Sequence, residues 1–302
     1  MLDLELEILC LLGIGIWIEK KGMLSAQTVS QLTDFVVDIV LPCAIVSSFE
    51  MKLTPEILVS TSQVFVLAIA MQGLYWILNR FLYRTWGNGE KICVKYATMV
   101  TNASFIGMPI AQSLYGATGL LFASISVLPQ RILMWSYGLS LYTNQKQDVD
   151  WRKILFHPCV VSIFIGIGVM AAYGAGFVLP EGVSKTLSMV GSCSTPLCLV
   201  IIGTIVGRLD WKDLFPWRGF LFSVYRVLFL PAMALLLVWC LPVHPLAKQI
   251  SILLAAMPAA TTTVILAEKY QKNPKFASQL MVLSTFLSFV SIPLFTFVLQ
   301  WV

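Results

Sequence analysis

The stretch NASFIGMPIAQSLYG, residues 102–116, lies in an apolar run and yet contains Gly107 and Pro109. Apolar runs of this kind predict helices that cross a membrane, and proline interrupts a helix because it lacks the backbone N–H group. In hydrocarbon, freed backbone groups are tolerated only where protein buries them or where they line a wet cavity. The stretch therefore predicts a membrane helix that is broken near mid-depth beside a functional cavity.

The composition of the whole chain indicates a membrane protein. Of 302 residues, 58% are apolar and 12% are charged, against about 45–50% and about 25% in soluble domains. Ten apolar segments, most of them close to the ~20 residues that a crossing helix needs, fall near residues 4–19, 28–50, 57–79, 94–114, 118–142, 154–176, 183–206, 219–241, 249–267 and 276–300. Because Glu5 and Glu7 shorten the first apolar run, a re-entrant or interfacial segment is the alternative there.

The distribution of Lys and Arg predicts the orientation of the chain. Alternate loops hold 15 and 3 of the 20 basic residues, while Arg131 and Arg226 lie inside spans. The positive-inside rule then assigns the rich loops to the cytoplasm and both termini to the outside. Since topology explains the net charge of +5, that charge gives no reason to expect a nucleic-acid partner.

Five spans in each half predict two halves that are inserted in opposite orientations, a common plan of carriers. Residues 1–145 form the first predicted five-helix repeat, 154–302 the second, and 146–153 a short cytoplasmic linker. Met108-Pro109 in the fourth span and Met257-Pro258 in the ninth support this correspondence. We therefore expect an all-α polytopic membrane protein in which helices four and nine are broken.

The two predicted breaks form a candidate substrate site. Half-helices that begin near Pro109 and Pro258 would direct positive dipole ends and unpaired amides toward the membrane centre, where an anionic group can bind. The other residues expected at this site are Asn102, Ser104, Gly107, Thr261 and Thr262. Helix packing is the alternative role for the Ser and Thr side chains. An amide at the depth of Asn102 needs several partners, which favours a binding role.

Four ionisable residues, Asp34, Asp38, Arg131 and Arg226, lie inside predicted spans, and each needs a partner or a wet cavity. Asp38 either exchanges a proton during transport or forms a static ion pair with Arg131. Arg131, next to Gln130, could instead neutralise a substrate carboxylate, so both are candidate binding residues. Arg226 lies near the cytoplasmic end of its span, where snorkelling to the interface is the favoured interpretation. Asp34 is expected to reach interfacial water or to pair locally.

Two further features are interpreted as structural. Gly168, Ala172 and Gly176 repeat every four residues, which favours close internal helix packing, with a homodimer interface as the alternative. Seven cysteines are scattered without metal-ligand spacing. We interpret them as small packing residues and expect neither a disulfide framework nor a metal site.

Several of these residues resemble the auxin efflux carrier family of membrane transporters in its compact bacterial form. The likeness covers nearly the whole chain and is carried by Asn102 with Gly107-Met108-Pro109, by the run Met257-Pro258-Ala259-Ala260-Thr261, by Leu41-Pro42, and by Arg226 with Pro231. It implies that the broken helices four and nine cross at the substrate site and that Asn102 contacts the substrate. Many bacterial members resemble carriers of dicarboxylates such as malate or malonate. The long central loop of many plant members is missing, which argues for a bacterial inner-membrane carrier and against auxin as cargo.

The sequence is compatible to different degrees with three classes of function: an anion transporter, a cation exchanger or channel, and an enzyme. The leading prediction is a secondary active transporter that moves a small organic anion by alternating access, needs no cofactor, and has coupling to H⁺ or Na⁺ left open. The alternative is a proton-coupled cation exchanger or channel in which Asp34 and Asp38 bind the cation, because a fold alone does not fix a function. An enzyme is not expected, since neither a His-Glu-x-x-His nor a Gly-x-Ser-x-Gly sequence occurs. The expected partners are thus the anion and the lipid bilayer.

Overall fold

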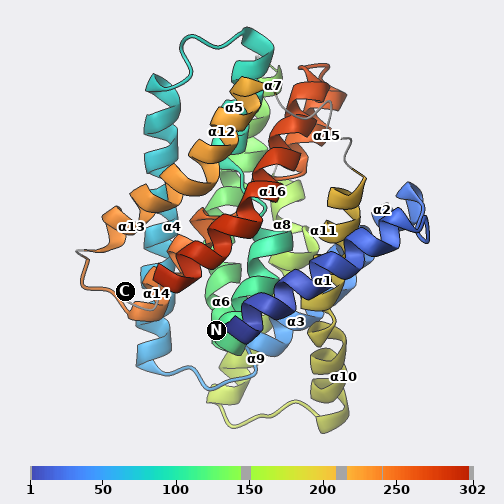
Figure 1. Cartoon of the computed structure of the whole chain (residues 1–302). Coiled ribbons are helices and arrows are strands. Elements are labelled where there is room, and N and C mark those ends of the chain that lie inside the picture. The colour runs from blue at the N-terminus through green and yellow to red at the C-terminus, as the bar shows by residue number, and fades with distance from the viewer. Residues whose placement is uncertain (1, 144–150, 209–215, 240, 299–302) are drawn as a thin grey trace. The chain divides into compact units, whose positions relative to one another are not determined.

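The structure is a computed structural model that describes residues 2–143, 151–208, 216–239 and 241–298. Within these residues every regular element is a helix, which confirms the all-α prediction (Figure 1). Residues 146–150 of the predicted linker lie outside the described residues. Its last three residues, Trp151–Lys153, begin a short helix that ends at Leu155.

The elements are named in chain order, with η marking π-helical turns. They are α1 Leu2–Lys20, α2 Ala26–Phe35, η1 Val36–Val40, α3 Leu41–Ser48, α4 Pro55–Phe81, α5 Asn88–Met99, η2 Ala103–Gly107, α6 Met108–Leu133, η3 Met134–Gly138, α7 Leu139–Thr143, α8 Trp151–Leu155, α9 Pro158–Gly174, α10 Glu181–Ser192, α11 Ser194–Gly207, α12 Trp217–Val224, η5 Tyr225–Phe229, α13 Leu230–Trp239, α14 Pro245–Ala255, α15 Thr262–Lys269 and α16 Pro274–Val298.

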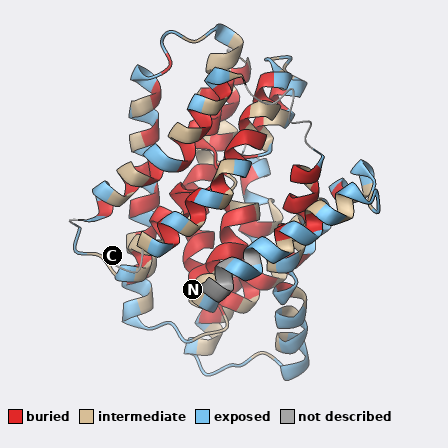
Figure 2. Ribbon diagram, viewed as in Figure 1, coloured by how far each residue is buried: buried red, intermediate tan, exposed pale blue. Residues whose placement is uncertain are grey.

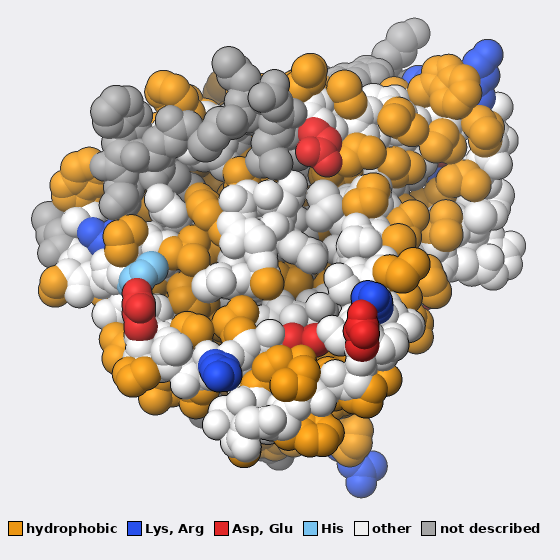
Figure 3. Space-filling model, turned by 90° about the horizontal axis from the view of Figure 1, so that it is seen from below, with side chains coloured by type: hydrophobic (Ala, Val, Ile, Leu, Met, Phe, Trp, Pro, Cys, Tyr) orange, Lys and Arg blue, Asp and Glu red, His pale blue; other side chains and the backbone are white. Residues whose placement is uncertain are grey.

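Six helical segments of the described chain are long and apolar enough to cross a membrane. They are Ala26–Ser48, Pro55–Phe81, Ala103–Thr143, Glu181–Gly207, Trp217–Trp239 and Pro274–Val298. The longest of them continues past a kink at Gly116, where φ is 64° and ψ is −153°. Seen from below in Figure 3, the described surface carries many hydrophobic side chains and few charged ones. Ten spans and an inverted repeat stay predictions.

The helices form two compact units, and neither unit coincides with one half of the chain. The first unit takes in residues 1–62, 104–125 and 155–209, and the second takes in residues 63–103, 126–154 and 210–302. Each unit thus combines segments from both halves. The predicted repeats at 1–145 and 154–302 concern duplication of the sequence and stay a prediction.

In the first unit, glycines let α1 and α11 pack with their backbones in contact. A Cβ atom added to Gly15 would lie 2.1 Å from the carbonyl oxygen of Val200 and 2.7 Å from the Cα of Gly203. A Cβ atom on Gly203 would lie 2.3 Å from the carbonyl oxygen of Leu12. Because side chains in lipid gain little from apolar burial, such close packing is a main source of helix association.

The predicted role of the small-residue repeat in span six is wrong. A Cβ atom on Gly168 would meet no atom within 4 Å, and Gly176 lies beyond the end of α9 with a φ of +87°. Internal packing therefore does not explain these two glycines, because no described residue of the first unit packs closely against them. The six described cysteines form no disulfide with one another, and Cys240 lies outside the described residues.

In the second unit, one helix is interrupted shortly before Met108-Pro109 and another at Met257-Pro258. The first helix ends with α5 at Met99 and resumes at Ala103, six residues before Pro109. The α-helix α6 begins at Met108, which confirms the start expected near Pro109, and the π-helical turn Ala103–Gly107 precedes it. The second helix ends with α14 at Ala255 and resumes with α15 at Thr262, so that Pro258 lies inside the gap. Residues 251–260 are all buried (Figure 2).

We expect Gly15→Ala to destabilise the first unit by about 1–3 kcal/mol, because the added methyl group must push α1 away from α11. The measurement is the midpoint of thermal unfolding of the purified protein in detergent. Gly13→Ala on the same helix is the matched control, since a Cβ atom there meets nothing within 4 Å. Equal midpoints for the two variants would contradict the close packing.

Candidate functional site

Two non-helical segments of the second unit pair with each other, and we call Val100–Asn102 together with Pro258–Ala260 the paired break. The N–H group of Asn102 donates to the carbonyl oxygen of Pro258 at 2.8 Å, and that of Ala260 donates to Val100 at 3.2 Å. Thr101 and Ala259 thereby form an isolated antiparallel β-bridge. Proline suits this position because the pairing uses its carbonyl group and does not need its missing N–H group.

A serine on α16 accepts a hydrogen bond from the Ala259 amide of the bridge. The N–H group of Ala259 donates to Ser284 Oγ at 3.1 Å, and Ser284 is fully buried. A buried amide without a partner would cost about 1–3 kcal/mol. This role of Ser284 is hard to predict from the sequence, because a single Ser in an apolar helix usually bonds to its own preceding turn.

Two tyrosines hold the first turn of α15. Tyr96 Oη donates to Thr262 Oγ1 at 3.1 Å, and Tyr142 Oη donates to the carbonyl oxygen of Thr263 at 3.1 Å. The two rings meet edge to face with centroids 5.3 Å apart. Neither tyrosine was expected from the sequence. Thr262 accepts a hydrogen bond within the protein and Thr261 is exposed, and a contact of either with substrate stays a prediction.

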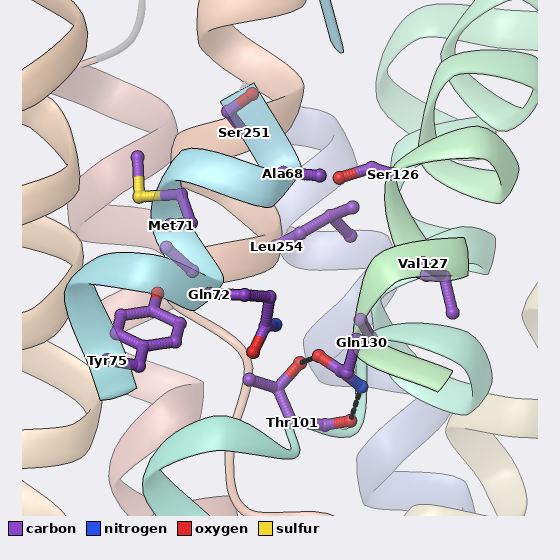
Figure 4. Close-up of a pocket in the computed structure, with 12 residues that line it drawn as sticks. Ala68, Met71, Gln72, Tyr75, Thr101, Ser126, Val127, Gln130, Ser251 and Leu254 are labelled. Atoms are coloured by element: carbon purple, nitrogen blue, oxygen red, sulfur yellow. Dashed lines mark hydrogen bonds between the residues drawn. The ribbon is translucent and has the colours of Figure 1, made fainter. Parts of the chain in front are cut away.

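Gln130 on α6 holds the other strand of the paired break. Its Nε2 donates to the carbonyl oxygen of Thr101 at 2.8 Å, and Thr101 Oγ1 donates to Gln130 Oε1 at 3.0 Å (Figure 4). Both side chains are buried. The amide of Gln130 thus bonds to the break itself, and a contact with substrate stays a prediction.

We expect Gln130→Leu to destabilise the protein by about 1–3 kcal/mol, because the carbonyl and hydroxyl groups of Thr101 lose their partner inside the protein. Thr101→Val is the matched comparison, since it removes only the hydroxyl bond and keeps the bond to the carbonyl oxygen. Thermal unfolding of the two purified variants should therefore rank Gln130→Leu as the less stable. The reverse order would mean that the double bond does not fix the break.

Asn102 is the predicted site residue whose geometry best suits a ligand. Its backbone is fixed by the bond to Pro258, while its half-buried side-chain amide has no hydrogen bond to the part of the chain that the structure describes. No side chain caps the N-terminus of α15 either. In the first turn of α15, the N–H groups of Thr263 and Val264 donate to the carbonyl oxygens of Ala260 and Thr261, each at 3.0 Å, whereas that of Thr262 has no hydrogen bond within the described residues. This N–H group lies at the positive dipole end of the helix. The paired break therefore offers donors to an anion.

A small polar cavity lies beside the paired break in the same unit. It leaves about 30 Å³ for the centres of water-sized molecules, enough for one or two waters. Gln72 and Tyr75 on α4 line it, together with Thr101 and Gln130, and Gln72 extends toward the latter two (Figure 4). The Gln72 Oε1 and Tyr75 Oη atoms are buried without a partner among the described residues. In the sequence, only the spacing of three residues between Gln72 and Tyr75 indicates that they lie on the same face of a helix.

Three predicted site residues, Ser104, Gly107 and Pro109, belong to the first unit. There the carbonyl oxygen of Pro109 accepts a hydrogen bond from Thr195 Oγ1 at 3.1 Å, and Gln112 Oε1 accepts one from Ser194 Oγ at 2.9 Å. The residues after the break are thus tied to the start of α11. Their membership in a common site with Asn102 stays a prediction.

The intramembrane charges differ from expectation in two respects. Arg226 does not snorkel: it is fully buried, and its Nη1 donates to the carbonyl oxygen of Ala255 at 3.1 Å. Asp38, expected to be buried, is exposed, as is Asp34. Asp38 lines an open groove of about 300 Å³ on the first unit. The physical reason in both cases is the face of the helix on which the residue lies, which hydropathy does not report.

Arg131 is buried in the second unit, at 7% exposure. Its predicted partner Asp38 belongs to the first unit, so the ion pair between them stays a prediction, as does a contact of Arg131 with substrate. Among the residues that the structure describes, no three His, Cys, Asp or Glu side chains lie close enough together to hold a metal ion.

The chain is similar to known membrane transporters along its whole length. The sequence profile of the family described as membrane transport protein matches residues 3–150 and 142–296. An uncharacterized transporter of Methanocaldococcus jannaschii is 22% identical over 307 aligned positions, covering 99% of this chain and 98% of that protein. An uncharacterized transporter of Methanothermobacter thermautotrophicus is 24% identical, covering 97% of both chains. A Rhizobium meliloti protein named "Putative malonate transporter" is 26% identical over 141 residues, 47% of this chain and 43% of that protein.

Proposed function

The chain belongs to the membrane transport protein family, and from this premise we propose that it is a secondary active transporter that carries a small organic anion across a bilayer. The proposed cargo is a mono- or dicarboxylate such as malonate or malate. It binds at the paired break, and alternating access around the broken helices exposes it to either side. The resemblance to the auxin efflux carriers seen in the sequence agrees with the family match.

The observation that carries this proposal is the donor set at the paired break. The side-chain amide of Asn102 is half-buried and makes no hydrogen bond within the described residues, and the same holds for the N–H group of Thr262 at the N-terminus of α15, which no side chain caps. Donors without partners are costly in a low-dielectric setting unless a ligand or water accepts from them. A carboxylate accepts several such bonds at once.

The charges of the second unit support an anion rather than a cation. Its two arginines inside spans, Arg131 and Arg226, are buried. The acidic residues that the structure describes in this unit are Glu90, which pairs with Arg218 at 2.7 Å, and the exposed Glu268. No described carboxylate of this unit therefore lies in its interior. A cation at the paired break would be repelled by the buried guanidinium of Arg226, which no described carboxylate of this unit compensates, whereas an anion would be stabilised by it.

The proposal is tested by binding and transport with purified protein. Isothermal titration with malonate, malate and monocarboxylic acids should give saturable binding, and reconstituted vesicles should accumulate the labelled acid that binds best. Inorganic cations should produce neither effect when the counter-anion is held constant. Saturable binding of a cation with no response to any organic acid would favour the exchanger or channel based on Asp34 and Asp38.

We expect Asn102→Ala to weaken binding of the organic acid at least tenfold while the protein stays folded in the membrane. Asn102→Asp should weaken it further, because the added negative charge repels a carboxylate. Titration calorimetry measures both affinities, and Asn88→Ala on the exposed start of α5 is the control that should bind like wild type. If the Asn102→Asp variant bound a cation more tightly than wild type does, the cargo would be a cation and the proposal would be wrong.

The proposal also includes the orientation of the chain in the membrane and the coupling of transport to an ion. The Lys and Arg bias of the loops supports termini outside the cytoplasm of a bacterial inner membrane. Coupling to H⁺ or Na⁺ is proposed to involve Asp38, whose carboxylate lies exposed in the groove on the first unit. Uptake driven by an imposed pH or sodium gradient, compared between wild type and Asp38→Asn, separates coupled from uncoupled transport.

A further inference from the structure

Arg226 is the most deeply enclosed charge in the second unit. It lies in η5, the π-helical turn between α12 and α13, and its side chain is fully buried. Nη1 bonds to Ala255, and the guanidinium carbon lies 5.8 Å from the ring centre of Tyr75. Its Nε and Nη2 atoms have no hydrogen-bond partner among the described residues.

No acidic side chain that the structure describes in this unit compensates that charge. Glu90 already pairs with Arg218, and Glu268 is exposed at the end of α15. Burial of an uncompensated guanidinium costs several kcal/mol, and apolar residues of similar volume usually pack at least as stably. A stabilising role in packing alone therefore gives a poor account of Arg226.

The contact with Ala255 places this charge on a helix end that faces the paired break. Ala255 is the last residue of α14, and Pro258 follows only three residues later. The last carbonyl groups of a helix carry about half a negative charge, which repels an anion nearby. A guanidinium bonded to that end offsets the repulsion. The positive N-terminus of α15 then dominates the field at the break.

We propose that Arg226 determines the charge of the cargo without touching it. It neutralises the C-terminal end of α14 and adds positive potential at the paired break, so that a dianion binds in preference to a monoanion or a neutral analogue. The inference rests on the proposed function, because it names which residue makes the same site selective for anions.

The experiment measures how binding affinity depends on the negative charge of the ligand, with three compounds of nearly the same shape. Malonate, malonamate and malonamide carry two, one and no negative charges, and titration calorimetry gives the affinity of each. Wild type should prefer the dianion over the neutral diamide. Arg226→Met should lose at least about tenfold of that preference, while Arg226→Lys should keep most of it because the charge remains. Arg80→Met at the exposed end of α4 is the matched control and should behave as wild type.

Two outcomes would overturn the role of Arg226. Arg226→Met could retain the wild-type preference, or it could weaken all three compounds by the same factor, as a purely structural residue would. If that variant does not fold, Arg226→Lys decides, because loss of preference with the charge still present would equally overturn the proposal. A wild-type protein that binds none of the three compounds would instead reject the proposed function itself.

Discussion

Everything at the candidate site depends on one constraint: backbone amide and carbonyl groups in apolar surroundings need hydrogen-bond partners. Interrupting one membrane helix would leave several such groups unpaired. The second unit interrupts two helices and pairs the gaps with each other, through the bonds between Asn102 and Pro258 and between Ala260 and Val100. Gln130 and Ser284 complete the set from α6 and α16. Each break is therefore tolerable only because the other exists.

The same pairing explains why a polar site can exist without unfolding the unit. Buried side chains of Thr101 and Gln130 satisfy each other, and Tyr96 and Tyr142 fix the start of α15. The Asn102 side-chain amide and the N–H group of Thr262, which have no hydrogen bond within the described residues, are thus held in place by hydrogen-bonded neighbours. Rigid support of this kind keeps donors oriented before a ligand arrives, which lowers the entropy lost on binding.

Charge distinguishes the interior of the second unit from an ordinary helical core. Burying a guanidinium usually costs more in desolvation than it returns in stability, yet Arg226 lies buried in η5 and bonds to the end of α14. The first unit is held together differently, by glycine contacts between α1 and α11 in which backbones touch. Sequence hydropathy treats both units alike, because it averages over the helix faces on which these differences lie.

The sequence by itself determined the class of the protein and the two broken helices, because proline and glycine have local consequences in hydrocarbon that need no partner to be known. It misjudged the snorkelling of Arg226, the burial of Asp38 and the packing of Gly168. It also missed Ser284, Tyr96, Tyr142, Gln72 and Tyr75. Those properties depend on which residues distant in the chain come to lie against a given helix face. Only the tertiary structure decides that, since the pairing of one break with the other is a contact across more than half of the chain.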